Sequence, residues 1–253
     1  MRLLADISTK YLRAYYNERF QDFDANGEAF ALNVFADFVG RQPITVWDVG
    51  ANTGGWASVA ASVLQEATIH SFEIVPAIAD AFEAELGGRP RHFLHRFGLS
   101  ETPGTVDVTH NLKSHTTSSI AYRDTEEFGT KMTIVECEVQ TIDLAIESGI
   151  SAPTLLKIDT EGHDFAVLRG ANTLLAGPDA PLMIQFEYGE TWLPPCETLE
   201  KCHKYLVDHG YALGRLYPNH VEFKDYSYED DHYRMGNMIA TRNEEFIRRL
   251  GGV

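Results

Sequence analysis

The sequence predicts an α/β fold of Rossmann type, with a mostly parallel sheet and helices on both of its faces. From Ile44 onward, short apolar runs alternate with stretches of helical periodicity, which is typical of βαβ units. Two of these runs lead through a glycine-containing turn into a helix, as in sheets that bind a ligand at their carboxyl edge. The 253 residues, 44% of them hydrophobic, are enough for one large core.

Two helices are expected before the sheet begins. Apolar residues lie three to four positions apart over residues 3–20 and again over residues 28–39. We therefore expect residues 1–40 to form a helical extension and residues 41–253 to form the α/β domain. Composition leaves two roles open for the extension, namely capping the site or pairing two subunits in a homodimer.

The strands and helices of the domain follow in alternation. The strands are expected at 44–49, 68–73, 91–97, 154–159 and 181–187, and again at 211–217 and 236–241. Apolar stripes with helical spacing cover residues 56–64, residues 78–86 after Pro76, and residues 167–175, where Gly177 and Pro178 end the last helix. These stripes are expected to pack on the sheet.

Two segments interrupt this alternation. Residues 105–109 and 134–139 look like strands on either side of a polar stretch, which we interpret as an insertion near the mouth of the site. The loop 224–233 is rich in tyrosine and acidic residues. That composition suits sugar stacking or an amine-bearing acceptor, and it equally suits a solvated acidic loop.

Composition argues against several classes of partner. The chain has 37 acidic and 21 basic residues, a formal net charge of −16, which repels nucleic-acid backbones and anionic lipid. Apolar runs are too short to span a bilayer, and Asp6 breaks the first one too early for a secretory signal, so a cytoplasmic location is expected. Cys137, Cys196 and Cys202 form no CxxC pair, and neither a disulfide framework nor a structural zinc site is indicated.

The strongest functional signal is the turn that runs from Asp48 to Gly54 after the first strand. Glycines let the main chain approach a ligand closely, and the start of the following helix offers free N–H groups. Asn52 stands where a dinucleotide-binding turn has its second glycine, which disfavours nicotinamide and flavin cofactors. The turn also lacks the Gly-Lys-Ser/Thr of a triphosphate-binding loop.

An acidic residue completes this signal. Glu73 ends the second strand, where a carboxylate can accept hydrogen bonds from both hydroxyls of a ribose. The alternative is an exposed carboxylate at the end of a strand. Together with the glycine turn, Glu73 favours a ligand that contains ribose but no pyrophosphate.

The second signal follows the strand 154–159. Asp159, Glu161, His163 and Asp164 crowd together at the carboxyl edge of the sheet, an arrangement that is expected to raise the basicity of the imidazole and to suit proton abstraction or metal binding. Alternatively, Thr160 or Asp164 caps the next helix while the other side chains are solvated. Glu187 ends the strand 181–187 and is expected to face the same crevice.

Six short motifs, in this order, resemble the FkbM family of methyltransferases over residues 44 to 190. They are Asp48–Gly54, Phe72-Glu73, Gly98-Leu99-Ser100, Thr141-Ile142-Asp143, Lys157–Gly162 and Val167–Gly170. The family is similar to class I S-adenosylmethionine-dependent methyltransferases. The resemblance implies a seven-stranded sheet with its last strand antiparallel, and methylation of hydroxyl groups on natural products or sugars.

The resemblance also implies a set of cofactor contacts for S-adenosylmethionine. These contacts are Asp48, Gly50, Ala51, Asn52, Thr53 and Gly54 for the methionine part, Glu73 and Ile74 at the ribose, and Gly98, Leu99 and Ser100 near the adenine, with Asp159 added at the second turn.

We therefore expect an O-methyltransferase that acts on a small hydroxylated molecule, with an N-methyltransferase acting on an amine or amide as the nearest alternative and an NAD-dependent oxidoreductase or epimerase as a more distant one. The candidate bases are His163, Asp159 and Glu161, while His110 or His115 could also reach the site. A divalent cation held by Asp159, Glu161 and Glu187 is a weaker alternative to metal-free chemistry.

Overall fold

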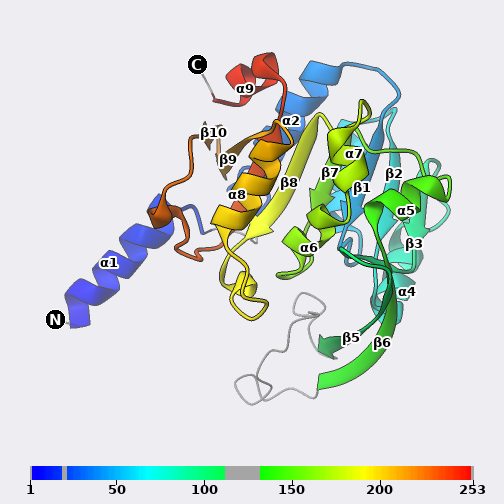
Figure 1. Cartoon of the computed structure of the whole chain (residues 1–253), viewed down its shortest axis with the longest axis horizontal. Coiled ribbons are helices and arrows are strands. Elements are labelled where there is room, and N and C mark those ends of the chain that lie inside the picture. Colours follow the sequence, from blue (N-terminus) through cyan, green and yellow to red (C-terminus); the bar gives the residue numbers. More distant parts are fainter. Residues whose placement is uncertain (1, 19–21, 112–131, 252–253) are drawn as a thin grey trace.

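The structure is a computed structural model that describes residues 2–18, 22–111 and 132–251. Its centre is a large twisted sheet with helices on both faces (Figure 1). In spatial order the strands of this sheet are β10 (His220–Phe223), β9 (Ala212–Tyr217), β11 (Gly236–Thr241), β8 (Met183–Tyr188), β7 (Leu155–Ile158), β1 (Thr45–Val49), β2 (Thr68–Phe72) and β3 (His92–His95).

The direction of the strands confirms the predicted fold class. Strands β3, β2, β1, β7 and β8 are parallel, and the sequence expectation placed all five correctly to within a few residues. Strand β11 is antiparallel and lies between β8 and β9. These strands and β9 make up the seven expected from the family resemblance, and β10 adds an eighth as the hairpin partner of β9.

Each face of the sheet carries its own hydrophobic cluster. One face is covered by α2 (Glu28–Val39), α3 (Gly55–Val63), α4 (Pro76–Leu86) and α9 (Glu244–Gly251). The other is covered by α5 (Ile142–Glu147), α6 (Asp164–Arg169), α7 (Asn172–Ala176) and α8 (Leu199–Asp208).

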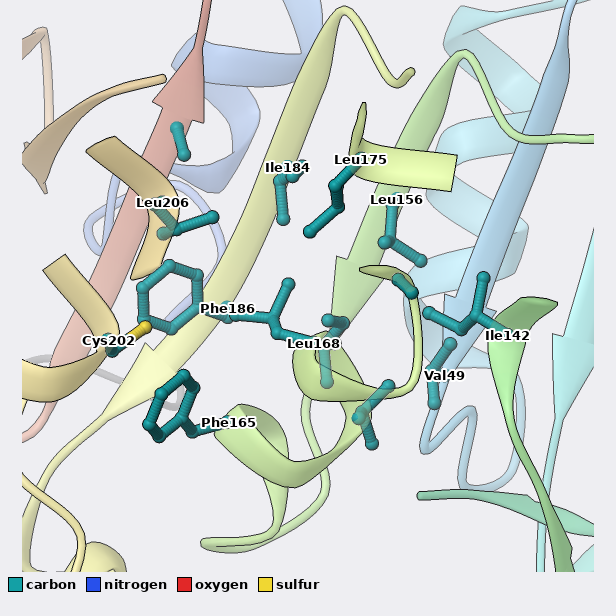
Figure 2. Packing of buried hydrophobic residues seen from close by; sticks show 14 of the residues in the cluster. Val49, Ile142, Leu156, Phe165, Leu168, Leu175, Ile184, Phe186, Cys202 and Leu206 are labelled. Atoms are coloured by element: carbon teal, nitrogen blue, oxygen red, sulfur yellow. The ribbon is translucent and has the colours of Figure 1, made fainter. Parts of the chain in front are cut away.

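The second cluster shows how side chains alternate across the sheet. Figure 2 shows Phe165 and Leu168 of α6, with Cys202 and Leu206 of α8, directed toward the strand residue Phe186 of β8. Because neighbouring residues of a strand point to opposite faces, the residues on either side of Phe186 face the first cluster. This alternation places the polar side chains of β7 and β8 on the α2 face of the sheet.

The helix expected from the stripe at 167–175 is in fact two short helices, α6 and α7. The break lies at Gly170 and Ala171. A Cβ atom at Gly170 would lie 2.1 Å from the carbonyl oxygen of Ser100, so the main chain passes close to the segment after β4 (Gly98–Leu99). The apolar spacing continues through the break, which is why periodicity alone suggested one helix.

The two strands predicted on either side of the insertion belong to a separate sheet. This sheet consists of β4, β6 (Met132–Gln140) and β5 (Gly104–Asn111), with β5 and β6 paired antiparallel over the full length of β5. Val108 and Cys137 of this hairpin pack against Val75 and Ile78 at the start of α4. The expected strands 105–109 and 134–139 are therefore confirmed, whereas the polar stretch with His115 lies outside the described residues.

The two N-terminal helices differ in their surroundings. Helix α1 (Arg2–Tyr15) extends away from the body of the molecule (Figure 1). Helix α2 buries Ala31, Leu32 and Phe35 in the same cluster as β1 and β8. In the described part of the chain all three cysteines are free thiols, and none of the described helices is both long and apolar enough to cross a membrane.

Candidate active site

The turn between β1 and α3 is built so that only glycine fits at two positions. Gly50 has φ 79°, and a Cβ atom there would lie 1.9 Å from the carbonyl oxygen of Asp159. Gly54 has φ 89°, and a Cβ atom would lie 2.4 Å from a methyl carbon of Leu86. Side chains are excluded by both backbone conformation and space, so the main chain of this turn lies close against the neighbouring segments.

Glu73 joins this turn to the end of β2. Its Oε2 atom accepts a hydrogen bond from the N–H of Asn52 at 2.9 Å, and its Oε1 atom accepts one from the N–H of Val75 at 2.9 Å. Asn52 itself has φ 50°, and its side-chain oxygen accepts a hydrogen bond from the N–H of Thr53 at 2.8 Å. The structure thus brings together the first two predicted motifs. Burial raises the pKa of Glu73, although the hydrogen bonds from Val75 and Asn52 oppose this rise.

An ion-paired lysine lies beside the turn. Lys157 of β7 is the register partner of Asp48 in β1, and its ammonium is 3.3 Å from Asp48 Oδ1 and 3.3 Å from Asp159 Oδ2. Burial alone would lower the pKa of Lys157, but the carboxylates of Asp48, Asp159 and Glu28 outweigh it and raise that pKa. Lys157 therefore lies at the centre of the site as an ion-paired ammonium.

Three residues that the sequence did not single out surround this lysine. Gln185 of β8 is its register partner on the other side, and the Gln185 amide donates a hydrogen bond of 2.6 Å to Glu28 Oε1. Trp56 of α3 lies with its ring 5.8 Å from the Lys157 ammonium. A charged residue within the otherwise apolar run Leu155–Ile158 is the signal that could have identified Lys157.

The turn after β7 gives Asp164 and His163 partners of their own, apart from Asp159. Asp164 is fully buried and turns back, where its carboxylate accepts hydrogen bonds from the N–H groups of Gly162 at 3.2 Å and Thr160 at 3.5 Å. Burial and the nearby charge of Asp159 raise the pKa of Asp164 to about 7. Asp159, by contrast, remains 41% exposed at the end of the strand. The alternative in which Thr160 or Asp164 caps the next helix is not confirmed, because the N–H groups of Gly162 and Thr160 both precede α6 and no side-chain hydrogen bond from the described residues caps its first turn.

The expectation that the acids raise the basicity of His163 is wrong. The ring of His163 points toward the segment after β4, with Nε2 2.9 Å from Ser100 Oγ. Burial lowers the pKa of His163, and this effect outweighs the opposing influence of Glu101 and Glu197. The acids that neighbour His163 in the sequence are not all its neighbours in space. The Asp164 carboxylate, for example, accepts hydrogen bonds from the main chain of the loop that precedes it.

The remaining predicted cofactor residues contact the segments that follow β2 and β7 or lie in the glycine turn itself. Gly98 is packed against Ile74, with a hypothetical Cβ atom only 2.6 Å from Ile74 Cδ1. Leu99 is buried, and Ser100 donates its N–H to the carbonyl oxygen of Gln140 at 2.8 Å. Ala51 is buried in the cluster beneath the turn.

The predicted carboxylate Glu187 lies at the end of β8 on the same face as Lys157. Burial raises the pKa of Glu187 well above its ordinary value, and the charges of Asp159, Glu161 and Asp164 raise it further. These carboxylates influence one another, but within the described ranges no three His, Cys, Asp or Glu side chains form a group arranged to hold a metal ion.

A separate hollow of about 140 Å³ lies farther along the same edge, beside β9 and β10. Its walls combine aromatic rings with charged groups, among them Tyr15, Tyr16, Tyr217, Tyr226, Glu222 and Asp230. The loop 224–233, which the sequence suggested for the crevice, supplies part of this lining.

Arg215 fixes the segment that follows α1 over this hollow. Its guanidinium donates hydrogen bonds to the carbonyl oxygens of Tyr16 at 2.7 Å and Met235 at 2.7 Å, and to that of Arg234 at 3.3 Å. Arg234 in turn pairs with Glu18 at 2.8 Å. The N-terminal segment is thus anchored to the start of β11, at the same edge of the sheet as the glycine turn.

Comparison with known families supports the interpretation of the motifs. A family model described as the methyltransferase FkbM domain matches residues 48–213, which is more than half of the chain. The match includes the glycine turn, Glu73, the segment 98–100 and the whole of β7 with the turn that follows it. It confirms the resemblance drawn from the sequence.

Individual proteins are more distant. The hexuronic acid methyltransferase AglP of Haloferax volcanii is 28% identical over 156 residues, which cover 60% of this chain and 59% of that protein. The chain therefore spans less than two thirds of the length of this curated relative.

Solved structures that are similar in fold include a precorrin-6y C5,15-methyltransferase of Geobacter metallireducens, with a TM-score of 0.45, 12% identity, and coverage of 85% of this chain and 88% of that one. A TehB-like SAM-dependent methyltransferase of Corynebacterium glutamicum has a TM-score of 0.44 and 11% identity, and the match covers 94% of this chain and 100% of that one.

Proposed function

We propose that this chain, which belongs to the FkbM methyltransferase family, transfers the methyl group of S-adenosylmethionine to a hydroxyl group of a sugar or another small hydroxylated molecule. The observation that carries this proposal is the link between the first two motifs, in which Glu73 holds the N–H of Asn52 beside the glycine turn. A carboxylate placed there suits a ribose, and the turn suits a ligand without a pyrophosphate.

The residues present fit such a cofactor. Gly50 and Gly54 keep the turn clear of side chains. The carboxylate of the fully buried Asp48, which meets the main-chain N–H of Ala57, has no side-chain partner among the described residues apart from the Lys157 ion pair, and the buried indole nitrogen of Trp56 has no hydrogen-bond partner among them. Buried polar atoms of this kind are uncommon unless a ligand or water satisfies them.

We therefore retain the predicted assignments for the cofactor. Residues 48–54 would hold the methionine part, Glu73 and Ile74 the ribose, and Gly98, Leu99 and Ser100 the adenine. S-adenosylmethionine supplies a methyl group already activated by a positively charged sulfur. The protein then has two tasks, which are to align the acceptor hydroxyl and to accept its proton. Alignment alone contributes roughly 7–11 kcal/mol in favourable cases, and a positioned base typically about 10²–10⁴ in rate.

We assign the proton acceptor to Asp159, with Glu161 as the alternative at the same edge. Asp159 is partly exposed at the end of β7, and the Lys157 ammonium holds one of its oxygens at 3.3 Å. The carboxylate can take the hydroxyl proton as the new O–C bond forms and then release that proton to solvent. His163 suits this role less well, because its ring is engaged with Ser100 and burial lowers its pKa.

Two observations support a sugar as the acceptor. The curated relative is named for a hexuronic acid, and the hollow beside β9 has several tyrosine rings together with carboxylates. Aromatic faces stack on the apolar face of a sugar ring, while carboxylates accept hydrogen bonds from its hydroxyls. We place the part of the acceptor that is remote from the methylated hydroxyl in this hollow.

The cofactor is tested by isothermal titration calorimetry and thermal unfolding with S-adenosylmethionine, S-adenosylhomocysteine and NAD. We expect binding of both adenosyl ligands, with a rise in Tm of several degrees when the ligand is at about 100 times its Kd. Binding of NAD alone, or of none of the three, would contradict the proposal.

The acceptor is tested with S-adenosylmethionine labelled in its methyl group. Glucuronic acid, methyl glucuronide, glucose and glucosamine are offered in turn, and mass spectrometry locates the methyl group on the product. Methylation at oxygen supports the proposal, whereas methylation of glucosamine at nitrogen favours the amine alternative. Asp159→Asn serves as the low-activity control.

A further inference from the structure

One buried ammonium near the glycine turn is surrounded by several carboxylates. Lys157 lies 3.3 Å from both Asp48 and Asp159. Glu28 and Glu187 also act on this group through their charges, since each has its pKa affected by both Lys157 and Asp159. With one ammonium against four carboxylates, this set has an excess of negative charge whenever its acids are ionised.

Glu28 is the member of this set that comes from the N-terminal segment. It is the first residue of α2, and it lies on the same face of the sheet as Lys157 and Gln185. Its Oε1 atom accepts a hydrogen bond from the Gln185 amide at 2.6 Å, and its Oε2 atom accepts one from the Asn26 amide at 2.6 Å. Both donors are neutral, so they orient the carboxylate without cancelling its charge.

The same place shows independent signs of a ligand. Asp48 is fully buried, and its carboxylate, which meets the main-chain N–H of Ala57, has no side-chain partner in the described part of the chain other than the Lys157 ammonium. The buried Trp56 indole nitrogen, close to the same ammonium, has no partner there either. Burial raises the pKa of Glu28, an effect that a cationic ligand would oppose.

We propose that Glu28 makes this site prefer the positively charged sulfonium of S-adenosylmethionine over the uncharged thioether of S-adenosylhomocysteine, an inference that rests on the cofactor named under the proposed function. The two molecules differ by one methyl group and one positive charge. A carboxylate near the methionine end stabilises the charged form alone, because the interaction of two charges in a poorly solvated site is far stronger than in water.

The consequence concerns the order of events after methyl transfer. Transfer removes the positive charge from sulfur, so the product loses the attraction of Glu28 while it is still bound. The N-terminal segment thereby contributes to exchange of product for fresh cofactor, without any contact to the methyl acceptor.

The experiment is calorimetry on the full chain with three ligands: S-adenosylmethionine, S-adenosylhomocysteine, and sinefungin, which carries a protonated amine in place of the sulfonium. Glu28→Gln removes the charge and keeps an oxygen that can accept from Gln185. We expect this variant to weaken binding of the two cationic ligands by about tenfold, and binding of S-adenosylhomocysteine by less than about twofold. Glu85→Gln, on the exposed side of α4, is the matched control and should change none of the three.

Equal weakening of all three ligands by Glu28→Gln would overturn the inference, because it indicates a structural role only. Glu28→Asp keeps the charge, and we expect it to keep the ratio of the affinities. The inference would also be overturned if Glu28→Asp lost the preference for the cationic ligands as completely as Glu28→Gln does. If the unmodified chain binds none of the three ligands, the proposed function fails first, and that result is distinct from binding without charge preference.

Discussion

The glycine turn and the hollow beside β9 lie at the same edge of the sheet but are built in opposite ways. At the turn, main-chain atoms of residues 50–54 lie close against β2 and the end of β7, and a single carboxylate, Glu73, fixes their position. At the hollow, side chains from α1, α8, β9, β10 and the loop 224–233 converge. The turn is therefore specified by a few adjacent residues, whereas the hollow depends on segments that are far apart in the chain.

The most severe test of this comparison is Gly50→Ala. The methyl group of an alanine at this position would lie 1.9 Å from the Asp159 carbonyl oxygen. The main chain of this alanine would also have to adopt φ 79°, which residues with a side chain rarely do. We expect affinity for S-adenosylhomocysteine to fall by more than about 100-fold, together with a lower Tm. Gly55→Ala is the matched control, since a Cβ atom there meets no other atom within 4 Å. Binding by Gly50→Ala similar to that of the unmodified chain would show that the turn tolerates a side chain.

A smaller effect is expected from Glu73→Ala, which removes the acceptor of two main-chain hydrogen bonds. Hydrogen bonds to charged groups contribute roughly 1.5–3 kcal/mol each, so we expect a loss of about 30-fold or more in affinity for the adenosyl ligands. Calorimetry is the measurement, and Glu66→Gln on the exposed surface is the control. An unchanged affinity would mean that the turn is preorganised without Glu73.

The turn after β7 can be tested through the pH dependence of stability. The pKa of Asp164 is raised from 3.8 to about 7, so the native state binds more protons than the unfolded state between those values. Stability is then lost as pH rises through this window. Between pH 5 and pH 7 we expect the free energy of unfolding of Asp164→Asn to fall by about 1–2 kcal/mol less than that of the unmodified chain, as measured by urea unfolding. An identical slope in the variant and the unmodified chain would contradict this expectation.

The smallest effect is expected from His163→Ala. Its ring contacts Ser100 rather than the exposed carboxylates, and burial lowers its pKa. We expect kcat to change by less than about threefold, whereas Asp159→Asn should lower kcat by about 100-fold or more. A large fall in kcat for His163→Ala with unchanged affinity for S-adenosylhomocysteine would restore His163 as the base.

Local patterns predicted the turn and the sheet. The strands β1, β2, β7 and β8 follow from apolar runs, and Glu73 follows from its position at the end of a strand. Helices α5 and α8 were not predicted, although Thr141 and Thr198 cap them with side-chain hydrogen bonds to Leu144 and Lys201. These caps were a readable signal.

Other features depend on contacts that no local pattern encodes. Glu28 reaches Gln185 across 157 positions of the chain, and Tyr16 reaches Arg215 across 199. The misplaced expectation for His163 has the same origin, because proximity in sequence was taken to mean convergence in space. The two roles considered for residues 1–40, which are capping the site and pairing two subunits, stay predictions. The homodimer itself also stays a prediction.

Strand β11 follows β9 and β10 in the chain, yet it lies between β8 and β9. During synthesis from the N-terminus, the β9–β10 hairpin therefore leaves the ribosome before the strand that connects it to the rest of the sheet. Until residues 236–241 emerge, the nascent protein has two unpaired strand edges, and such edges favour association with other chains. The sheet is thus completed only after β11 has emerged, and the interval before that is when a chaperone would be of most use.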